Sequence, residues 1–178
     1  LDIGANIGNH SVFFSKFFKK VYSFEPHPLI YNLLSFNTAD LNIDTFNYGL
    51  SNKNATLSIE TNQKTSLGSS KIVNKNTTDS PAYYKSKVIV KKLDDQEFIN
   101  KLNSRIDFIK IDVENHELEV LEGMNKVLTK NNPIICMEQH SSEFFKDTNN
   151  NYTSKSIEYL NQNSYNFFYT IDNAREWK

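Results

Sequence analysis

The stretch Leu1-Asp2-Ile3-Gly4-Ala5-Asn6-Ile7-Gly8-Asn9-His10-Ser11 decides the fold, because it predicts a strand, a tight turn and a helix in succession. Leu1 to Ile3 are typical of the end of a buried strand. Gly4 and Gly8 bracket the turn, where glycine tolerates positive φ and lets a ligand approach the backbone. We expect a helix from about Asn9 with one buried apolar face. The residues of that face are Val12, Phe13, Phe14, Phe17 and Phe18.

Three interpretations of this turn are open on the residues alone. The dinucleotide-binding pattern G-x-G-x-x-G places a pyrophosphate close to its second glycine. This chain has Asn6 at that position and Asn9 at the position of the third glycine, which disfavours a nicotinamide dinucleotide. S-adenosylmethionine has no phosphate, and its ammonium and carboxylate could meet Asp2 and the polar backbone groups of the turn. An ordinary glycine-rich connection in an α/β protein is the third interpretation.

Length and composition indicate a single domain over residues 1–178. A formal charge of −1 with mixed signs predicts no nucleic-acid partner. No apolar run reaches the ~20 residues of a membrane helix and no signal peptide is visible, so we expect a cytoplasmic protein without a membrane span. The chain begins inside a predicted strand without an initiator methionine, so we also expect that N-terminal sequence is missing.

The single cysteine, Cys136, excludes a disulfide framework and a cysteine-based metal site. Its apolar neighbours predict a buried thiol in the core.

An acidic residue, Glu25, follows the second predicted strand, Val21 to Phe24, about 20 residues beyond the glycine turn. A carboxylate at this place can accept two hydrogen bonds from the hydroxyls of a ribose. The structural alternative is a carboxylate that caps the next helix or complements its dipole. Pro28 suits the first turn of that helix, and we expect His27 to be a local capping group rather than a catalyst.

The middle of the chain is less regular. Ile43 to Tyr48 predict a third strand that leads to a turn at Gly49, where backbone groups can flank an adenine ring. Ala55 to Glu60 alternate well enough to predict another strand. Residues 61–87 are rich in Asn, Ser, Thr and Lys, which predicts a long flexible surface loop that could supply part of a substrate pocket.

Acidic residues and a histidine crowd the end of the next predicted strand, Ile106 to Ile111. The residues are Asp112, Glu114, His116 and Glu117. In open α/β sheets, ligands bind outside the carboxyl ends of the strands. We therefore expect this junction to face the same crevice as the glycine turn and the acid after the second strand.

A fifth predicted strand, Ile134 to His140, ends with two more polar side chains, Glu138 and His140. Because successive strand residues point to opposite faces, these two share a side. With Asp112 and Glu114 they could offer oxygen and nitrogen ligands to a divalent cation. Their spacing dictates no ligand set, so no metal is expected.

Together these segments resemble the FkbM family of S-adenosylmethionine-dependent methyltransferases over nearly the whole chain. The matching segments are Asp2 to Ser11, Phe24-Glu25-Pro26, Asn47 to Asn52, Ile109 to Glu114 with Glu117 to Gly123, and Glu138-Gln139-His140. The family usually has glycine after Asp112-Val113-Glu114, where this chain has Asn115. Because asparagine tolerates the left-handed conformation better than most residues, we expect the turn to survive this change.

The resemblance implies an α/β, Rossmann-like methyltransferase fold. Its central sheet would be mostly parallel, with helices on both faces and a final antiparallel strand, for which Tyr165 to Ile171 are the candidate. The resemblance also implies S-adenosyl-L-methionine as the cofactor. The residues expected to bind it are Asp2, Gly4, Ala5, Asn6, Gly8, Asn9, Glu25, Gly49, Leu50 and Asp112.

The implied reaction is methylation of a hydroxyl on a saccharide, lipid or natural-product acceptor. A general base assists the deprotonation of an alcohol, and the candidates are Asp112, Glu114, His116 and His140. We expect His140 or Glu114 to be this base, and Asp112 to lie nearest the methionine portion or the substrate. For each histidine, a structural hydrogen-bonded role is the alternative. A nicotinamide-dependent oxidoreductase and a non-catalytic domain of the same fold are the other functions that the sequence leaves open, and it specifies neither the acceptor nor the oligomeric state.

Overall fold

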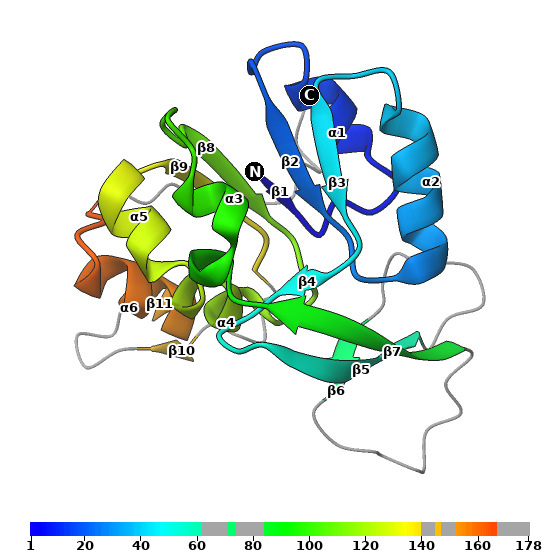
Figure 1. Ribbon diagram of the computed structural model, residues 1–178. Coiled ribbons are helices and arrows are strands. Elements are labelled where there is room, and N and C mark those ends of the chain that lie inside the picture. Colours follow the sequence, from blue (N-terminus) through cyan, green and yellow to red (C-terminus); the bar gives the residue numbers. More distant parts are fainter. Residues whose placement is uncertain (62–70, 74–83, 140–144, 147–151, 167–178) are drawn as a thin grey trace, which may run out of the picture.

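The computed structural model describes residues 1–61, 71–73, 84–139, 145–146 and 152–166. Within them the main sheet has five parallel strands in the order β3-β2-β1-β8-β9 (Figure 1). The strands are β1 (Asp2–Ile3), β2 (Val21–Phe24), β3 (Ile43–Phe46), β8 (Phe108–Ile111) and β9 (Ile134–Met137). The predicted mostly parallel α/β sheet is thus confirmed.

Register places the predicted site residues at one edge of this sheet. Ile3, the last residue of β1, pairs with the last residue of β2 and with the last residue of β8. The next residues, Gly4, Glu25 and Asp112, therefore leave the sheet at the same level. The strands that carry them are neighbours, so the sheet itself brings together residues more than 100 positions apart in the chain.

Helices cover both sides of the main sheet, with α1 (Asn9–Phe14) and α2 (Pro28–Thr38) on one side and α3 (Glu97–Asn100) and α5 (Asn125–Asn131) on the other (Figure 1). The His27 side chain caps α2, as predicted, and Pro28 occupies its first turn. The buried core packs Phe24, Ile109, Ile111 and Leu121 around the sheet. No helix in the described residues is long and apolar enough to cross a membrane.

The described residues of the range 61–87, for which a loop was predicted, lie in strands of a second sheet. Its strands are β4 (Gly49–Leu50), β5 (Ala55–Thr61), β6 (Lys71–Val73) and β7 (Tyr84–Lys91), in the order β4-β7-β5-β6. The loop prediction is wrong for the described part of that range, because β7 already begins at Tyr84 and pairs with all of β5. The polar composition did not indicate a strand here, because most side chains of β7 are half-buried or exposed. Only Val88 and Val90 of this strand are buried.

The predicted helix after the acidic junction is two short helices, α4 (Glu117–Glu122) and α5. They are separated at Gly123, where an added Cβ would lie 2.0 Å from the carbonyl oxygen of Ser51. Close contact with the end of β4 therefore interrupts the helix. Asp94, in the 3-10 helix η2 (Leu93–Asp95), caps α5 by accepting hydrogen bonds from the N–H groups of Lys126 and Val127.

The C-terminal part holds α6 (Lys155–Gln162), and the side chain of Ser154 caps it by accepting from the N–H of Ile157. Two short strands precede it, β10 (Phe145–Lys146) and β11 (Tyr152–Thr153), which pair in an antiparallel manner. The predicted final antiparallel strand lies mostly outside the described residues, because only Tyr165 and Asn166 of its range are described and neither is in a strand.

Two burial predictions are wrong. Phe13 and Phe17 are 54% and 69% exposed, because α1 ends at Phe14 and these rings lie on its outer side. Cys136 is exposed rather than buried. It lies in β9, the last strand of the main sheet within the described residues, where Ile134 is exposed on the same face.

Candidate functional site

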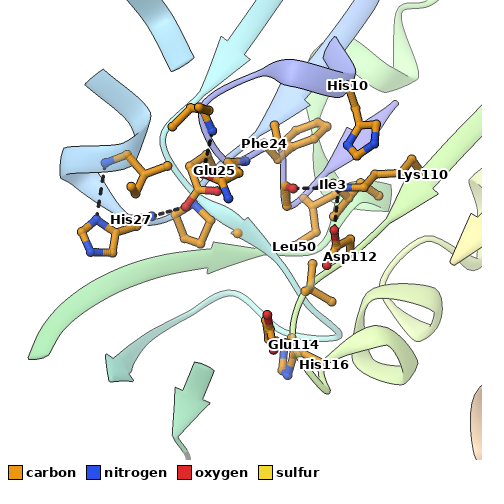
Figure 2. Close-up of a pocket in the computed structure, with 18 of the residues that line it drawn as sticks. Ile3, His10, Phe24, Glu25, His27, Leu50, Lys110, Asp112, Glu114 and His116 are labelled. Atoms are coloured by element: carbon orange, nitrogen blue, oxygen red, sulfur yellow. Dashed lines mark hydrogen bonds and ion pairs between the residues drawn. The ribbon is translucent and has the colours of Figure 1, made fainter. Parts of the chain in front are cut away.

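A cavity of about 240 Å³ opens at the carboxyl edge of the main sheet. Its walls come from the turns after β1, β2 and β8, and from Leu50 and Ile59 of the second sheet. Figure 2 shows Glu25 and His27 toward one end, and His10, Lys110 and Asp112 toward the other. The three predicted sheet-edge positions, Gly4, Glu25 and Asp112, thus line one cavity.

The glycine turn after β1 is held by contacts within the protein. Gly4 and Gly8 have φ values of 75° and 98°, in the region that favours glycine. A Cβ on Gly4 would lie 1.8 Å from the carbonyl oxygen of Asp112, so this glycine lets the turns after β1 and β8 touch. A Cβ on Gly8 would lie 2.9 Å from Leu34 of α2. Gly8 therefore faces the helix α2 and is not among the residues that line the cavity.

Glu25 is buried, and two backbone amides orient its carboxylate. Oε2 accepts from the N–H of Asn6 at 3.0 Å, and Oε1 accepts from the N–H of His27 at 2.8 Å. Burial raises the pKa of Glu25 to about 7, although both hydrogen bonds favour the charged form. Each carboxylate oxygen keeps a second lone pair, so the group can still accept hydrogen bonds from a ligand.

A buried lysine, Lys110, joins the turns at the other end of the cavity. Its Nζ donates to the carbonyl oxygen of Gly4 at 2.9 Å and lies 3.2 Å from Oδ2 of Asp112. It also lies 3.5 Å from Oδ1 of Asp2, which is fully buried behind the cavity wall. The carboxylate of Asp2 accepts from Ser11 as well. Asp2 thus supports the turn through its contacts with Lys110 and Ser11. It is not among the residues that line the cavity.

Asp112 is the most strongly paired acid of the site. Burial alone would raise its pKa, but a hydrogen bond with Glu138, the charge and hydrogen bond of Lys110 and the nearby His10 lower it overall. The carboxylate of Asp112 is therefore held in its charged form at the cavity wall.

The turn after Asp112 has the conformation that the sequence suggested. Glu114 and Asn115 have φ values of 56° and 71°, so asparagine does occupy a left-handed position where a glycine was expected. Glu114 and His116 both line the cavity. His116 shares a hydrogen bond with Ser51 through Nε2 at 3.0 Å, and burial lowers its pKa. The imidazole thus ties the turn to the end of β4.

Most predicted cofactor-binding and catalytic positions line the cavity. They are Gly4, Ala5, Asn6, Asn9, Glu25, Gly49, Leu50, Asp112 and Glu114. His140 lies outside the described residues. Lys110 and His10, which the sequence reading missed, also line the cavity. A lysine inside the apolar run Phe108 to Ile111 was a usable signal, because a buried charge requires partners; His10 carried no such signal.

The donors and acceptors suit an elongated polar ligand. At one end the carboxylate of Glu25 can accept two hydroxyl hydrogens, as a sugar diol provides. At the other end charges of both signs meet, and apolar groups such as Ile3 and Leu50 lie between the two ends (Figure 2). Such a cavity can bind a nucleoside that bears a charged substituent.

Comparisons with known proteins agree with this fold. A sequence family described as the methyltransferase FkbM domain matches residues 2–168. The chain is 30% identical over 149 residues to the hexuronic acid methyltransferase AglP of Haloferax volcanii, a match that covers 82% of this chain. A crystal structure of methyltransferase FkbM from Methylobacillus flagellatus KT superposes with a TM-score of 0.51 over 76% of this chain, at 18% identity. That structural likeness concerns the fold alone.

The chain spans only part of both proteins. It covers 57% of the length of the Haloferax volcanii methyltransferase and 31% of the crystallised protein.

Proposed function

This chain belongs to the FkbM methyltransferase family, and we propose that it transfers a methyl group from S-adenosylmethionine to a hydroxyl oxygen of a saccharide. One observation carries the proposal: the turns after three adjacent parallel strands bring Gly4, Glu25 and Asp112 to a single cavity. The substrate class draws on the name of the Haloferax volcanii relative, which acts on hexuronic acid.

The residues of the cavity fit this cofactor. Glu25 would accept hydrogen bonds from the two ribose hydroxyls, while Gly49 and Leu50 would flank the adenine. Asp112 would face the ammonium of the methionine portion, and Asp2 would act indirectly by holding Lys110. When bound, the cofactor supplies an electrophilic methyl group on a positively charged sulfur. The carboxylates of Glu25, Asp112 and Glu114 make a wall that favours such a cation.

Glu114 is the base that we propose within the described residues. It lines the cavity from a left-handed turn, close in sequence to the charged Asp112. As the acceptor oxygen bonds to the methyl carbon, the carboxylate of Glu114 would take the hydroxyl proton. His140, which lies outside the described residues, is the second proposed base. Positioning the acceptor in a cavity from which Leu50 and Ile59 exclude water would contribute the rest of the rate enhancement.

A hydroxyl suits this cavity better than a carboxylate as the methyl acceptor. Carboxylates of the site would repel an anionic acceptor, and the ammonium of Lys110 is already paired with Asp2 and Asp112. A neutral sugar hydroxyl meets no such repulsion, and it can donate its hydrogen bond to Glu114.

Titration calorimetry with S-adenosylhomocysteine tests the proposal without knowledge of the acceptor. We expect binding, weakened by about 1–3 kcal/mol in Glu25→Ala because a charge-assisted pair of hydrogen bonds is lost. Lys20→Ala, on an exposed ion pair remote from the cavity, is the control. A folded protein that does not bind the ligand at millimolar concentration would contradict the proposal.

Mass spectrometry then tests the acceptor class. Neutral saccharides and uronic acids are incubated with the protein and S-adenosylmethionine, and the products are fragmented to locate the added methyl. A methyl ether is expected. Methylation confined to the carboxylates of uronic acids would refute the preference for a hydroxyl.

A further inference from the structure

One end of the cavity carries charges of both signs. Lys110 and His10 bring the positive or potentially positive groups, and Asp112, hydrogen-bonded to Glu138, brings the negative ones. Figure 2 places His10, Lys110 and Asp112 together, away from Glu25 and His27. A ligand end that carries an ammonium and a carboxylate would match this arrangement.

The ammonium of Lys110 is already engaged by groups of the protein. A lysine ammonium has three N–H groups. Its Nζ lies 2.9 Å from the carbonyl oxygen of Gly4, 3.2 Å from Asp112 and 3.5 Å from Asp2. Two close acceptors and a third carboxylate oxygen at 3.5 Å thus surround the ammonium, so a second donor at this end would favour the binding of a ligand carboxylate.

His10 is placed to be that donor. It lies in the first turn of α1, its side chain is exposed, and it lines the cavity. Its ring stacks on Phe14 with centroids 6.0 Å apart, and Phe14 packs edge-on against Phe108 at 5.3 Å. Aromatic packing therefore fixes the plane of the imidazole without using its nitrogen atoms.

The other histidines that line the cavity within the described residues each have a structural partner, although Nε2 of His27, at the Glu25 end of the cavity, has no hydrogen bond. Nδ1 of His27 accepts from the N–H of Ile30 at the start of α2. His116 bonds to Ser51 through Nε2, and its Nδ1 lies 3.6 Å from Glu119. No hydrogen bond joins His10 to another residue in the described part of the chain, so both of its ring nitrogens are available to a ligand.

We propose that His10 binds the carboxylate of the amino-acid portion of S-adenosylmethionine, an inference that rests on the proposed function. The imidazole donates an N–H to the carboxylate, and the neighbouring Asp112 faces the ammonium. His10 is thus a binding residue that sets the direction of the cofactor in the cavity, with the ribose at Glu25 and the amino acid at α1.

Three ligands distinguish carboxylate binding by His10 from a structural role or a role as the base. S-adenosylhomocysteine has both charged groups, its decarboxylated analogue keeps only the amine, and 5′-methylthioadenosine has neither. Their dissociation constants are measured by calorimetry for the wild-type protein, His10→Phe and His10→Asn. His10→Phe keeps an aromatic ring against Phe14, and His10→Asn keeps a polar donor of different reach. Phe13→Ala, on the outer side of the same helix, is the control.

We expect the wild-type protein to prefer S-adenosylhomocysteine over its decarboxylated analogue by about tenfold, the effect of one charge-assisted hydrogen bond. In His10→Phe this ratio should fall below about threefold, while the affinity for methylthioadenosine changes by less than about twofold. His10→Asn should lie between the two proteins, and Phe13→Ala should match the wild type.

Three results would overturn the inference while leaving the proposed function intact. The preference for S-adenosylhomocysteine over its decarboxylated analogue could persist in both His10 variants. All three ligands could lose affinity equally, which would indicate a structural role for His10. The affinities could stay unchanged while methyl transfer is lost, which would make His10 the base. If the wild-type protein bound none of the three ligands, the proposed function itself would fail.

Discussion

The two sheets that border the cavity are built in different ways. In the main sheet, three neighbouring parallel strands end at one level, so the residue after each strand enters the cavity. In the second sheet, β5 and β7 pair along seven residues in an antiparallel ladder, and only Ile59 of that ladder lines the cavity. Topology thus places the groups that would bind the cofactor, whereas the second sheet contributes mainly shape.

This difference implies a division of labour. Changes at the strand ends of the main sheet should affect folding and cofactor affinity together, because those residues contact one another as well as the ligand. Changes in β5 and β7 of the second sheet should affect the acceptor more than the cofactor, whereas Gly49 and Leu50 of β4 would flank the adenine. The predictions below test that division, starting with the largest expected effect.

Gly4→Ala should be the most disruptive single change. Its Cβ would lie 1.8 Å from a backbone oxygen, and its φ of 75° is strained for alanine. We expect a loss of about 3 kcal/mol or more in the free energy of unfolding, measured by urea denaturation. Gly49→Ala, at the second sheet, is the matched control, because its Cβ would lie 3.3 Å from a side-chain carbon of Val90 rather than 1.8 Å from a backbone oxygen. Equal losses of unfolding free energy in Gly4→Ala and Gly49→Ala would contradict this division of labour between the two sheets.

Asp94→Ala tests the connection between the two regions. Asp94 follows β7 and accepts from Lys126 at 2.9 Å and from Val127 at 3.1 Å, the first N–H groups of α5. Removal of this cap should cost about 1–2 kcal/mol of unfolding free energy. Because Asp94 does not line the cavity, the affinity for S-adenosylhomocysteine should stay within about twofold. A large loss of affinity in the folded variant would show that the regions are coupled.

Ligand affinity should depend on pH through Glu25. Its pKa is raised to about 7, and the ionised carboxylate is the form that accepts two hydroxyl hydrogens. As the pH falls from 8 to 6 the ionised fraction drops about tenfold, so the affinity should fall by the same factor. 5′-methylthioadenosine is the suitable probe, because it has no amino-acid group that titrates in this range. Glu25→Gln should bind more weakly with no such pH dependence; if the wild-type affinity is flat, Glu25 does not touch the ribose.

We expect the smallest change in unfolding free energy from removal of the lysine of an ion pair. Lys20 and Asp44 form an exposed pair beside the main sheet, and their separation is 2.7 Å. Lys85 pairs with Glu60 in the second sheet at 2.8 Å, where Glu60 is only 8% exposed. Lys20→Ala should change the unfolding free energy by less than about 0.5 kcal/mol, and Lys85→Ala by more, because it leaves a buried carboxylate without this partner. Thermal denaturation of Lys20→Ala and Lys85→Ala at the same pH measures this difference in stability.

The sequence predicted the main sheet well because its signals are local. Buried strands such as Val21 to Phe24 show as apolar runs, and the rule for strand ends then placed Glu25 and Asp112 in one crevice. His27 as a cap followed from residue chemistry, and Asn115 in a left-handed turn followed from the glycine that the resembling family has at this position.

The rest depended on contacts that are distant in the sequence. The strand β7 is polar for half its length and forms because β5 pairs with it. Gly8 looked like a ligand contact, but its missing side chain makes room for Leu34. Asp2 looked accessible, yet Lys110 stands between it and the cavity. No local pattern reports which neighbour a side chain will meet after folding.

The most direct test of the account is a crystal structure of the protein with S-adenosylhomocysteine. The account predicts the ribose hydroxyls within hydrogen-bonding distance of the Glu25 carboxylate and the amino-acid group between His10 and Asp112. A ligand bound elsewhere, or one in this cavity whose ribose lies away from Glu25, would contradict it.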